Sequence, residues 1–276
     1  GGIAGLWVSR SVSKPATRLV DAVQAIGKRD LGYRVPEEGS QELVDLAHAI
    51  NQMADDLENA EKIRRNQLAD VTHELRTPLT VLQGNLRALL DGVYAPDEKE
   101  ISALYEQTLH LEELISDLHL LALAEAKQMP NHPQTVDIFP IVQQTVASFE
   151  ALAVSRNIQI ALESTARDFI ITIDPRYVEQ ILHNLLSNSI KNTPPDGRVM
   201  VRLVRDANDI LLSVTDSGVG IPADELPFIF ERFYRKDESR RSDAAGSGLG
   251  LTITKRIVDE LGGMIEARST VGEGSV

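Results

Sequence analysis

The chain has 276 residues, which is too long for one typical domain and predicts two or three domains. It contains no cysteine, which excludes disulfide bonds and thiolate metal sites, and its net charge of −13 argues against general binding to nucleic acid. Aromatic residues make up only 4% of the chain, a composition that suits helical bundles built on aliphatic side chains.

The N-terminal residues 1–9 form a short apolar stretch that is followed directly by Arg10 and Lys14. A helix needs about 20 apolar residues to cross a bilayer, so this stretch is too short to do so alone. An apolar segment followed by basic residues is typical of a transmembrane helix at its cytoplasmic end, which predicts membrane attachment through residues 1–9. A frayed, mildly apolar terminus is the alternative.

Two heptad patterns lie on either side of a break between Gly27 and Ser40. Steps of three and four residues are typical of coiled-coil seams, and the break is long enough to join two parallel helices. Narrow seams on short helices bury little surface, so we expect association with a second copy of the chain. The seam residues are Val12, Ala16, Leu19, Val23, Ile26, Leu43, Leu46, Ile50, Met53 and Leu57.

A helical hairpin is predicted next, with a long helix over residues 59–93 and a second helix that runs to about Lys127. Gly92 and Pro96 mark the turn between them. A short connection makes the two helices antiparallel, and two such hairpins would close into a four-helix bundle. Residues 129–133 break the second helix with two prolines and predict a domain boundary. The apolar stripe of the first helix comprises Leu68, Val71, Leu75, Leu79, Leu82, Leu86 and Leu89, and that of the second Ile101, Leu104, Leu111, Ile115 and Leu118.

After Pro133 the pattern changes to mixed helices and strands. Because some of the strands follow one another directly, an α+β layer with helices on one face is expected. Asp174 as N-cap and Pro175 at the first helical position give one helix a clear start. The predicted strands are 158–162, 169–173, 199–204, 210–215 and 264–268, and the predicted helices are 138–155, 175–192, 223–232 and 249–261.

His73 has an unusual position in the first hairpin helix. At about 100° per residue, His73 points away from Val71 and Leu75, which face the bundle, and therefore toward solvent. Pro78 removes a backbone hydrogen bond and should bend the helix beside it.

The neighbours of His73 suit phosphoryl chemistry. A neutral imidazole is a competent nucleophile, and Glu74 can orient the ring or accept its proton. Thr77, one turn further on, can position a water that attacks phosphohistidine. A solvated surface histidine, one of six histidines in the chain, is the alternative interpretation.

Asn184, Asn188 and Lys191 fall at helical spacing on one face of the helix over 175–192. Carboxamide oxygens suit Mg²⁺, which prefers hard oxygen ligands, and the lysine would attract phosphate. A polar solvent face is the alternative if these three residues are considered alone.

Two glycine-rich loops strengthen the prediction of a nucleotide site. The first begins with Asp216, which could accept a hydrogen bond from an exocyclic amine such as that of adenine, and Gly218 and Gly220 allow close approach of the backbone. The second loop, residues 246–250, opens a predicted helix whose N-terminus favours phosphate. Arg235, between the loops, is a candidate phosphate ligand, whereas Phe228, Phe230 and Phe233 are expected to pack in the core.

Together these motifs resemble the two-component sensor histidine kinases over essentially the whole chain. The resemblance implies the end of a transmembrane helix at 1–9, a HAMP module at 10–62, a dimerisation and phosphotransfer hairpin at 63–130, and an ATP-binding domain of the Bergerat type, an α+β sandwich, at 134–276. Pro15 and Glu42 match residues typical of HAMP modules. Asn192 departs from the family, which often has an aromatic residue there, and the last strand is expected to be cut short.

The resemblance also assigns roles to single residues. His73 matches the phosphoacceptor, with Glu74 and Thr77 as its catalytic neighbours for phosphotransfer and dephosphorylation. Asn188 is the expected Mg²⁺ ligand, and Asn184 is expected to support the metal or its water. The expected nucleotide-binding residues are Asn184, Asn188, Lys191, Asp216, Gly218, Gly220, Tyr234, Arg235, Gly246, Gly248, Leu249, Gly250 and Leu251.

The chain is therefore expected to be the cytoplasmic portion of a membrane-bound, homodimeric kinase that uses ATP and Mg²⁺. It would phosphorylate His73 and pass the phosphoryl group to an aspartate in the receiver domain of a response regulator, with phosphatase activity in addition. Two alternatives remain at this stage: a signalling scaffold that binds ATP without transferring phosphate, and another ATPase of the same superfamily.

Overall fold

The computed structural model describes residues 14–93, 97–126, 128–166, 168–206, 209–234 and 247–276. The chain divides into two compact units, Gly1–Glu74 and Leu75–Val276. The transmembrane end predicted at residues 1–9 lies outside the described residues. Among the helices that are described, none combines the length and the apolar character needed to cross a bilayer.

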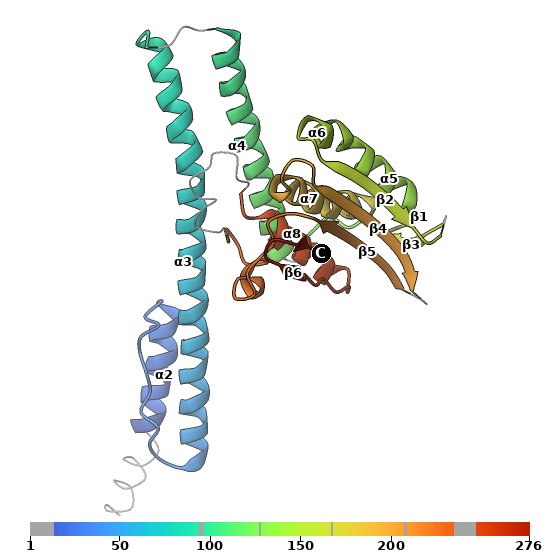
Figure 1. The fold of residues 1–276 in the computed structure, drawn as a ribbon. Coiled ribbons are helices and arrows are strands. Elements are labelled where there is room, and N and C mark those ends of the chain that lie inside the picture. The colour runs from blue at the N-terminus through green and yellow to red at the C-terminus, as the bar shows by residue number, and fades with distance from the viewer. Residues whose placement is uncertain (1–13, 94–96, 127, 167, 207–208, 235–246) are drawn as a thin grey trace, which may run out of the picture. The chain divides into compact units, whose positions relative to one another are not determined.

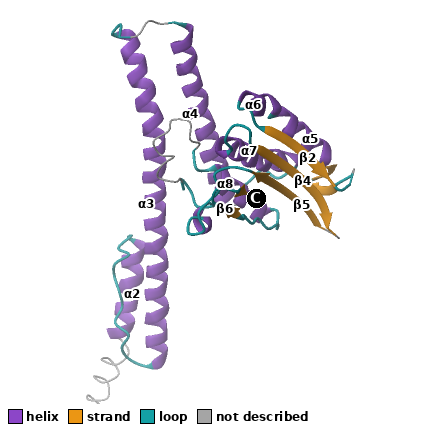
Figure 2. Cartoon of the chain, viewed as in Figure 1, coloured by secondary structure: helices purple, strands orange, loops and turns teal. Residues whose placement is uncertain are grey.

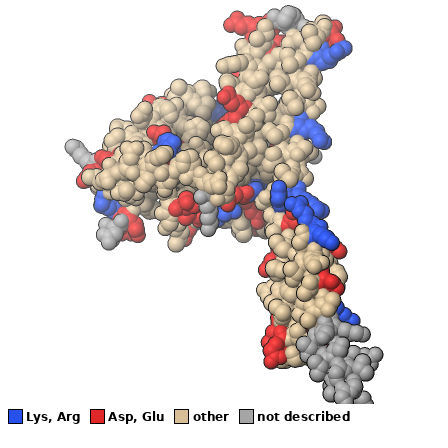
Figure 3. Space-filling model, turned by 180° about the vertical axis from the view of Figure 1, so that it is seen from behind, with Lys and Arg blue, Asp and Glu red and all other residues tan. Residues whose placement is uncertain are grey.

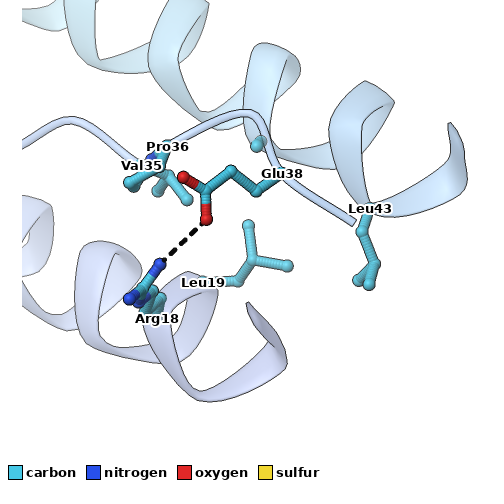
Figure 4. Close-up of a pocket in the computed structure, with 7 residues that line it drawn as sticks. Arg18, Leu19, Val35, Pro36, Glu38 and Leu43 are labelled. Atoms are coloured by element: carbon cyan, nitrogen blue, oxygen red, sulfur yellow. Dashed lines mark hydrogen bonds and ion pairs between the residues drawn. The ribbon is translucent and has the colours of Figure 1, made fainter. Parts of the chain in front are cut away.

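The first unit contains α2 (Lys14–Gly27) and the beginning of α3 (Gln41–Leu90), joined by an extended connection (Figure 1). Asn51 of α3 fixes this connection, because its side chain accepts a bond of 2.8 Å from the Val35 N–H and donates one of 2.9 Å to the Val35 carbonyl. Arg18 and Glu38 lie 3.4 Å apart across a small pocket above Leu19 (Figure 4).

The apolar core of this unit contains only part of the predicted heptad seams. Small side chains of both helices are fully inside, among them Ala22 and Ala54, together with Leu19, Ile26 and Ile50. Four other large seam residues stay 43–50% exposed within the single chain. They are Val23, Leu46, Met53 and Leu57.

Helix α3 differs from the prediction of two separate helices over 43–57 and 59–93, because it is continuous from Gln41 to Leu90. No glycine or proline interrupts it before Pro78, so the helical hydrogen bonds continue without a stop signal. Pro78 lies within the helix, which nevertheless continues for three more turns.

The second unit begins with the rest of α3, which forms a hairpin with α4 (Glu98–Glu125), as predicted (Figure 2). Asp97 caps α4 by accepting a hydrogen bond of 2.9 Å from the Glu100 N–H. Asn85 and Gln107 join the two helices through their side chains at 3.5 Å. On α4, Leu114 and Leu121 are buried, whereas Ile101 and Ile115 are more than half exposed.

The remainder of the second unit is a two-layer α+β domain, as expected. Its main sheet has the order β2-β4-β5-β7-β6, and β1 and β3 form a separate antiparallel pair. In the main sheet β2 is parallel to β4, and the other neighbours are antiparallel. The strands are β1 (Gln134–Asp137), β2 (Gln159–Ser164), β3 (Ile170–Ile173), β4 (Arg198–Asp206), β5 (Asp209–Asp216), β6 (Ser269–Thr270) and β7 (Gly274–Ser275).

Helices cover one face of this sheet (Figures 1 and 2). Along β4 the alternate residues Val199, Val201 and Leu203 are completely buried, as expected for a strand with one covered face. They pack with Leu182 and Leu186 in the main apolar core. The helices of the domain are α5 (Phe139–Ser148), α6 (Glu150–Ser155), α7 (Pro175–Asn192) and α8 (Gly250–Glu260).

Several predicted elements of this domain are wrong. The helix expected at 223–232 is only the 3₁₀ turn Leu226–Phe228, because Pro227 cannot donate a helical hydrogen bond and Phe233 has a φ of 57°. The strand expected at 264–268 is irregular, since of these residues only Arg268 exchanges backbone hydrogen bonds, with Val276. The helix expected at 138–155 is divided at Phe149. Strands β1 and β6 had not been predicted, whereas β7 lies in the C-terminal segment where a shortened last strand was expected.

Candidate nucleotide site and phosphoacceptor helix

Helix α7 begins at a buried carboxylate, that of Asp174. Asp174 caps the helix by accepting a hydrogen bond of 3.1 Å from the Arg176 N–H, and its carboxylate also binds the Arg176 guanidinium at 2.6 Å. A further bond of 2.9 Å comes from the His132 N–H in the segment that follows α4. The Arg176 side chain, above all, holds the pKa of Asp174 well below its usual range. The start of α7 is therefore fixed to the preceding linker.

Asn184 joins α7 to the first turn of α8. Its Nδ2 atom donates to the Gly250 carbonyl at 3.0 Å and to the Thr254 hydroxyl at 3.3 Å, while Gln180 donates to its Oδ1 at 3.3 Å. This half-buried carboxamide therefore holds the helix N-terminus that was predicted to receive phosphate.

Asn188 and Lys191 are both exposed one and two turns further along α7. The Asn188 Oδ1 atom accepts a hydrogen bond of 3.1 Å from the side chain of Asn192, the last residue of the helix. Because Mg²⁺ binds oxygen, the donor chemistry of Asn188 fits a magnesium ion that is also held by phosphate.

Asp216 ends β5 next to α7 and is half-buried. Its carboxylate accepts hydrogen bonds from the Gly218 N–H at 2.9 Å and from the Ser189 hydroxyl at 3.4 Å. Burial raises the pKa of the Asp216 carboxyl, and the hydrogen bonds only partly oppose this rise. These contacts hold an acceptor in place at the end of the strand.

The glycines of the first loop allow its backbone to pack closely against the backbone of two other segments. A Cβ atom at Gly218 would lie 2.5 Å from the Asn192 carbonyl oxygen, and one at Gly220 would lie 2.1 Å from the Thr270 carbonyl oxygen. Gly220 also has a φ of 70°, in the left-handed region that favours glycine. The loop is thus packed between the end of α7 and the C-terminal strands.

The second glycine loop leads directly into α8. Gly248 has a φ of 71°, and its carbonyl accepts a hydrogen bond of 3.1 Å from the Phe233 N–H. Leu249 is fully buried and Leu251 half-buried, so their side chains anchor the helix start. The predicted ligands Arg235 and Gly246 lie outside the described residues.

The aromatic segment before the second loop is only partly in the core. Phe233 packs against the cluster that contains Leu249, as predicted, and Phe230 is half-buried with Lys255 at 5.7 Å from its ring. The prediction is wrong for Phe228, which is 46% exposed. Its ring stacks with that of Tyr234 at a centroid separation of 6.2 Å.

Helix α4 also contacts the second glycine loop, a contact that the sequence pattern did not predict. The Asp117 carboxylate accepts a hydrogen bond of 3.2 Å from the Ser247 hydroxyl, and Glu125 forms an ion pair with Arg232. Between these residues, Leu121 packs with Leu249 and the apolar side chains of α8. The sequence feature that could have indicated this contact is the position of Asp117 between Leu114 and Leu121, on the same helical face.

The proposed phosphoacceptor is on α3. His73 and Thr77 are exposed and one helical turn apart, whereas Glu74 is half-buried. The exposure of His73 confirms the orientation inferred from helical phase. The boundary between the two compact units falls directly after Glu74.

Comparisons with known proteins match these parts in the same order. Family models match residues 7–59 as a HAMP domain and 63–127 as a His Kinase A (phospho-acceptor) domain. Residues 173–276 match the histidine kinase-, DNA gyrase B- and HSP90-like ATPases.

The relatives are named as histidine kinases. The signal transduction histidine-protein kinase BaeS of Escherichia coli (strain K12) is 33% identical over 276 residues, which cover 99% of this chain and 59% of BaeS. The solved structure of Acinetobacter baumannii histidine kinase AdeS has 28% identity and a TM-score of 0.63, covering 74% of this chain and 94% of that one. Histidine kinase ThkA in complex with response regulator protein TrrA has a TM-score of 0.63 at 22% identity, over 79% and 61% of the two chains, and shows a likeness of fold alone.

The fold and the matches define a phosphoacceptor hairpin combined with a Bergerat-type ATPase domain. The chain belongs to the sensor histidine kinases. It spans 59% of the length of BaeS.

Proposed function

We propose that this chain is an ATP-dependent protein-histidine kinase that phosphorylates its own His73. The observation that carries the proposal is the convergence of α7, the end of β5 and the N-terminus of α8, which are held together by Asn184 and Asp216. Polar side chains from three elements meet there, whereas a polar solvent face would involve one helix only. The ATPase family match to residues 173–276 supports ATP as the ligand.

Each part of the site has a proposed task toward ATP. Asp216 accepts a hydrogen bond from the adenine amine, and the amides at the start of α8 bind phosphate with the help of the helix dipole. Lys191 and Arg235 add positive charge. Asn188, supported by Asn184, would hold Mg²⁺, which supplies charge neutralisation for the phosphates when it is bound.

In the proposed reaction a ring nitrogen of His73 attacks the γ-phosphorus. A P–N bond forms while the bond from the γ-phosphorus to the β,γ-bridging oxygen breaks, and ADP leaves with that oxygen. Glu74 orients the imidazole and accepts its proton. The phosphoryl group then passes to an aspartate of a response-regulator receiver domain. In a separate phosphatase reaction, Thr77 positions a water that attacks the phosphoaspartate of that regulator, which releases inorganic phosphate and restores the aspartate.

The proposed assembly is a homodimer. The exposed seam residues of the first unit and the half-exposed Ile101 and Ile115 of α4 support it, because pairing with a second copy would bury them. The structure of ThkA with its response regulator supports the class of partner proposed here.

The proposed location is the cytoplasmic side of a cell membrane, with attachment through residues 1–9. The proposed domain bounds are 10–62 for HAMP, 63–130 for the hairpin and 134–276 for the ATP-binding domain. No nucleic-acid partner is proposed, since the net charge is −13 and acidic and basic side chains are scattered over the face in Figure 3.

The test is incubation with γ-labelled ATP and Mg²⁺, followed by analysis of acid-labile protein phosphate. His73→Ala should lose the label, and His119→Ala, a control at an exposed position on α4, should keep it. Label that persists in His73→Ala would reject the assignment. ATP binding by wild-type protein without any phosphohistidine would instead favour a signalling scaffold.

A further inference from the structure

Asn192, the residue that departs from the family pattern, is held by hydrogen bonds of both its side chain and its main-chain carbonyl. Its side-chain Nδ2 atom donates to the Asn188 carbonyl at 2.8 Å and to the Asn188 Oδ1 atom at 3.1 Å. Its own carbonyl accepts a hydrogen bond of 3.2 Å from the Val219 N–H of the first glycine loop. The main chain of Asn192 is therefore fixed to that loop, and its side chain is fixed to Asn188 on α7.

Helix termination explains neither of the two bonds that Asn192 donates. Helix α7 ends at Asn192, so the carbonyls that lack intrahelical partners are those of residues 189–192. The bond to the Asn188 carbonyl is a local back-bond of the kind that short polar side chains make in helices. The bond to Asn188 Oδ1 satisfies no backbone group. It fixes the orientation of the Asn188 carboxamide, because the oxygen and nitrogen ends of a carboxamide have nearly equal shape and could otherwise exchange places.

The orientation of Asn188 matters for metal binding. Mg²⁺ takes oxygen ligands, so a flipped carboxamide would present N–H groups to the cation. A donor placed against Oδ1 leaves the second lone pair of that oxygen available to a metal. On the same helix, Gln180 donates to Asn184 Oδ1 at 3.3 Å across the same spacing of four residues.

We propose that Asn192 is a positioning residue for the magnesium site, which fixes Asn188 with its oxygen available to the Mg²⁺ of bound ATP. This inference rests on the proposed function of the site. Partners that orient metal ligands affect metal affinity strongly without touching the metal. The aromatic residue that is frequent at this position in the family could not supply the same carboxamide donor.

The experiment measures ATP dissociation constants twice for each variant, with excess Mg²⁺ and with EDTA. The ratio of the two constants reports how much Mg²⁺ strengthens ATP binding. Asn192→Leu removes the donor at similar size, and Asn192→His keeps an N–H donor. Thr145→Ala is the matched control, because Thr145 also donates to the carbonyl four residues earlier, in α5 and outside the site. Unfolding temperatures without nucleotide accompany each measurement.

Asn192→Leu should lower the ratio by about tenfold while the constant in EDTA stays unchanged, and Asn192→His should recover most of the ratio. Thr145→Ala should change only the unfolding temperature. An unchanged ratio in Asn192→Leu, or equal weakening with and without Mg²⁺, would overturn the inference and leave Asn192 with a structural role at the end of α7. Wild-type protein that binds no ATP would reject the proposed function, and this inference with it.

Discussion

The Asp117 carboxylate on α4 accepts a hydrogen bond of 3.2 Å from the Ser247 hydroxyl in the second glycine loop. The Ser247 oxygen also accepts a bond of 3.3 Å from the Leu249 N–H at the entrance to α8. An acidic side chain of the phosphotransfer hairpin is thus linked, through one hydroxyl, to the backbone that is proposed to bind phosphate.

This link should depend on pH. Burial raises the pKa of the Asp117 carboxyl, and the negative charge of Glu113 adds to the rise, whereas Ser247, His183 and Lys191 oppose it. A carboxyl with a higher pKa in the folded than in the unfolded protein contributes most stability at acid pH. That contribution is lost as the pH rises through the folded-state pKa.

Asp117→Asn, which removes the titration, is therefore expected to have nearly the same unfolding temperature as wild type at about pH 4 and a higher one at neutral pH. Thermal unfolding followed by circular dichroism across this range measures the difference. A difference that is constant with pH would show that Asp117 does not titrate differently in the folded protein.

Alanine substitutions of two asparagines on α7 should have different effects on stability and on ATP binding. Asn184→Ala loses two hydrogen bonds to α8, so it should lower the unfolding temperature by about 2–6 °C and also weaken ATP binding. Asn188→Ala, at an exposed position, should keep the unfolding temperature but lose Mg²⁺-dependent ATP binding. Calorimetry on nucleotide-free and ATP-loaded protein separates the two effects, and equal stability losses would contradict the assignment.

Asp216→Asn should make the nucleotide-free protein slightly more stable and bind ATP about 10–100-fold more weakly. The stability rises because the burial that raises the pKa of Asp216 opposes its ionised form at neutral pH. Wild-type ATP affinity should also fall on acidification, as the carboxylate takes up a proton. Asp209→Asn, at the exposed opposite end of β5, is the control and should leave ATP affinity unchanged.

Gly220→Ala and Gly250→Ala form a pair that tests steric room in the two loops. The added methyl group at Gly220 would overlap the Thr270 backbone in a left-handed conformation, so this variant should lose several degrees of thermal stability. At Gly250 the nearest contact is the Asn184 side chain at 3.5 Å, an ordinary packing distance, and the fold should persist. The measurement is the unfolding temperature of each variant relative to wild type. A Gly220→Ala variant as stable as wild type would contradict the close approach of Gly220 to Thr270.

Thr77→Ala should keep autophosphorylation and reduce dephosphorylation of the response regulator by at least about tenfold, because the proposed water-positioning hydroxyl is lost. The assay follows the decay of regulator phosphate with unphosphorylated kinase added. Thr80→Ala is the control, since Thr80 is exposed on α3 and its hydroxyl donates to the Arg76 carbonyl. Equal rates of regulator dephosphorylation with the two variants would contradict the role proposed for Thr77.

Local signals predicted α7 to the residue. Asp174 caps the helix, Pro175 begins it, and its polar face carries Asn184 and Asn188 as expected. Such signals act within one helical turn, so no tertiary contact is needed to interpret them. The exposure of His73 followed from helical phase for the same reason.

Contacts between distant segments could not be predicted in this way. The bond from Ser247 to Asp117 joins residues 130 positions apart, and it exists only because apolar side chains of α4 pack on α8. The helix predicted at 223–232 is absent for a local reason, because Pro227 cannot donate a helical hydrogen bond and only a 3₁₀ turn forms. Strand β1 is short and pairs only with β3, so its alternation was too brief to recognise.

The hydrogen bonds of the buried Asp174 carboxylate have a mechanical consequence. It fastens the segment after α4, through the His132 N–H, to the first residues of α7. Asn188 lies about 21 Å further along the same stiff helix. A displacement of the linker would therefore move α7 as one rigid element. The proposed magnesium ligand Asn188 would move with it, without an intervening flexible loop.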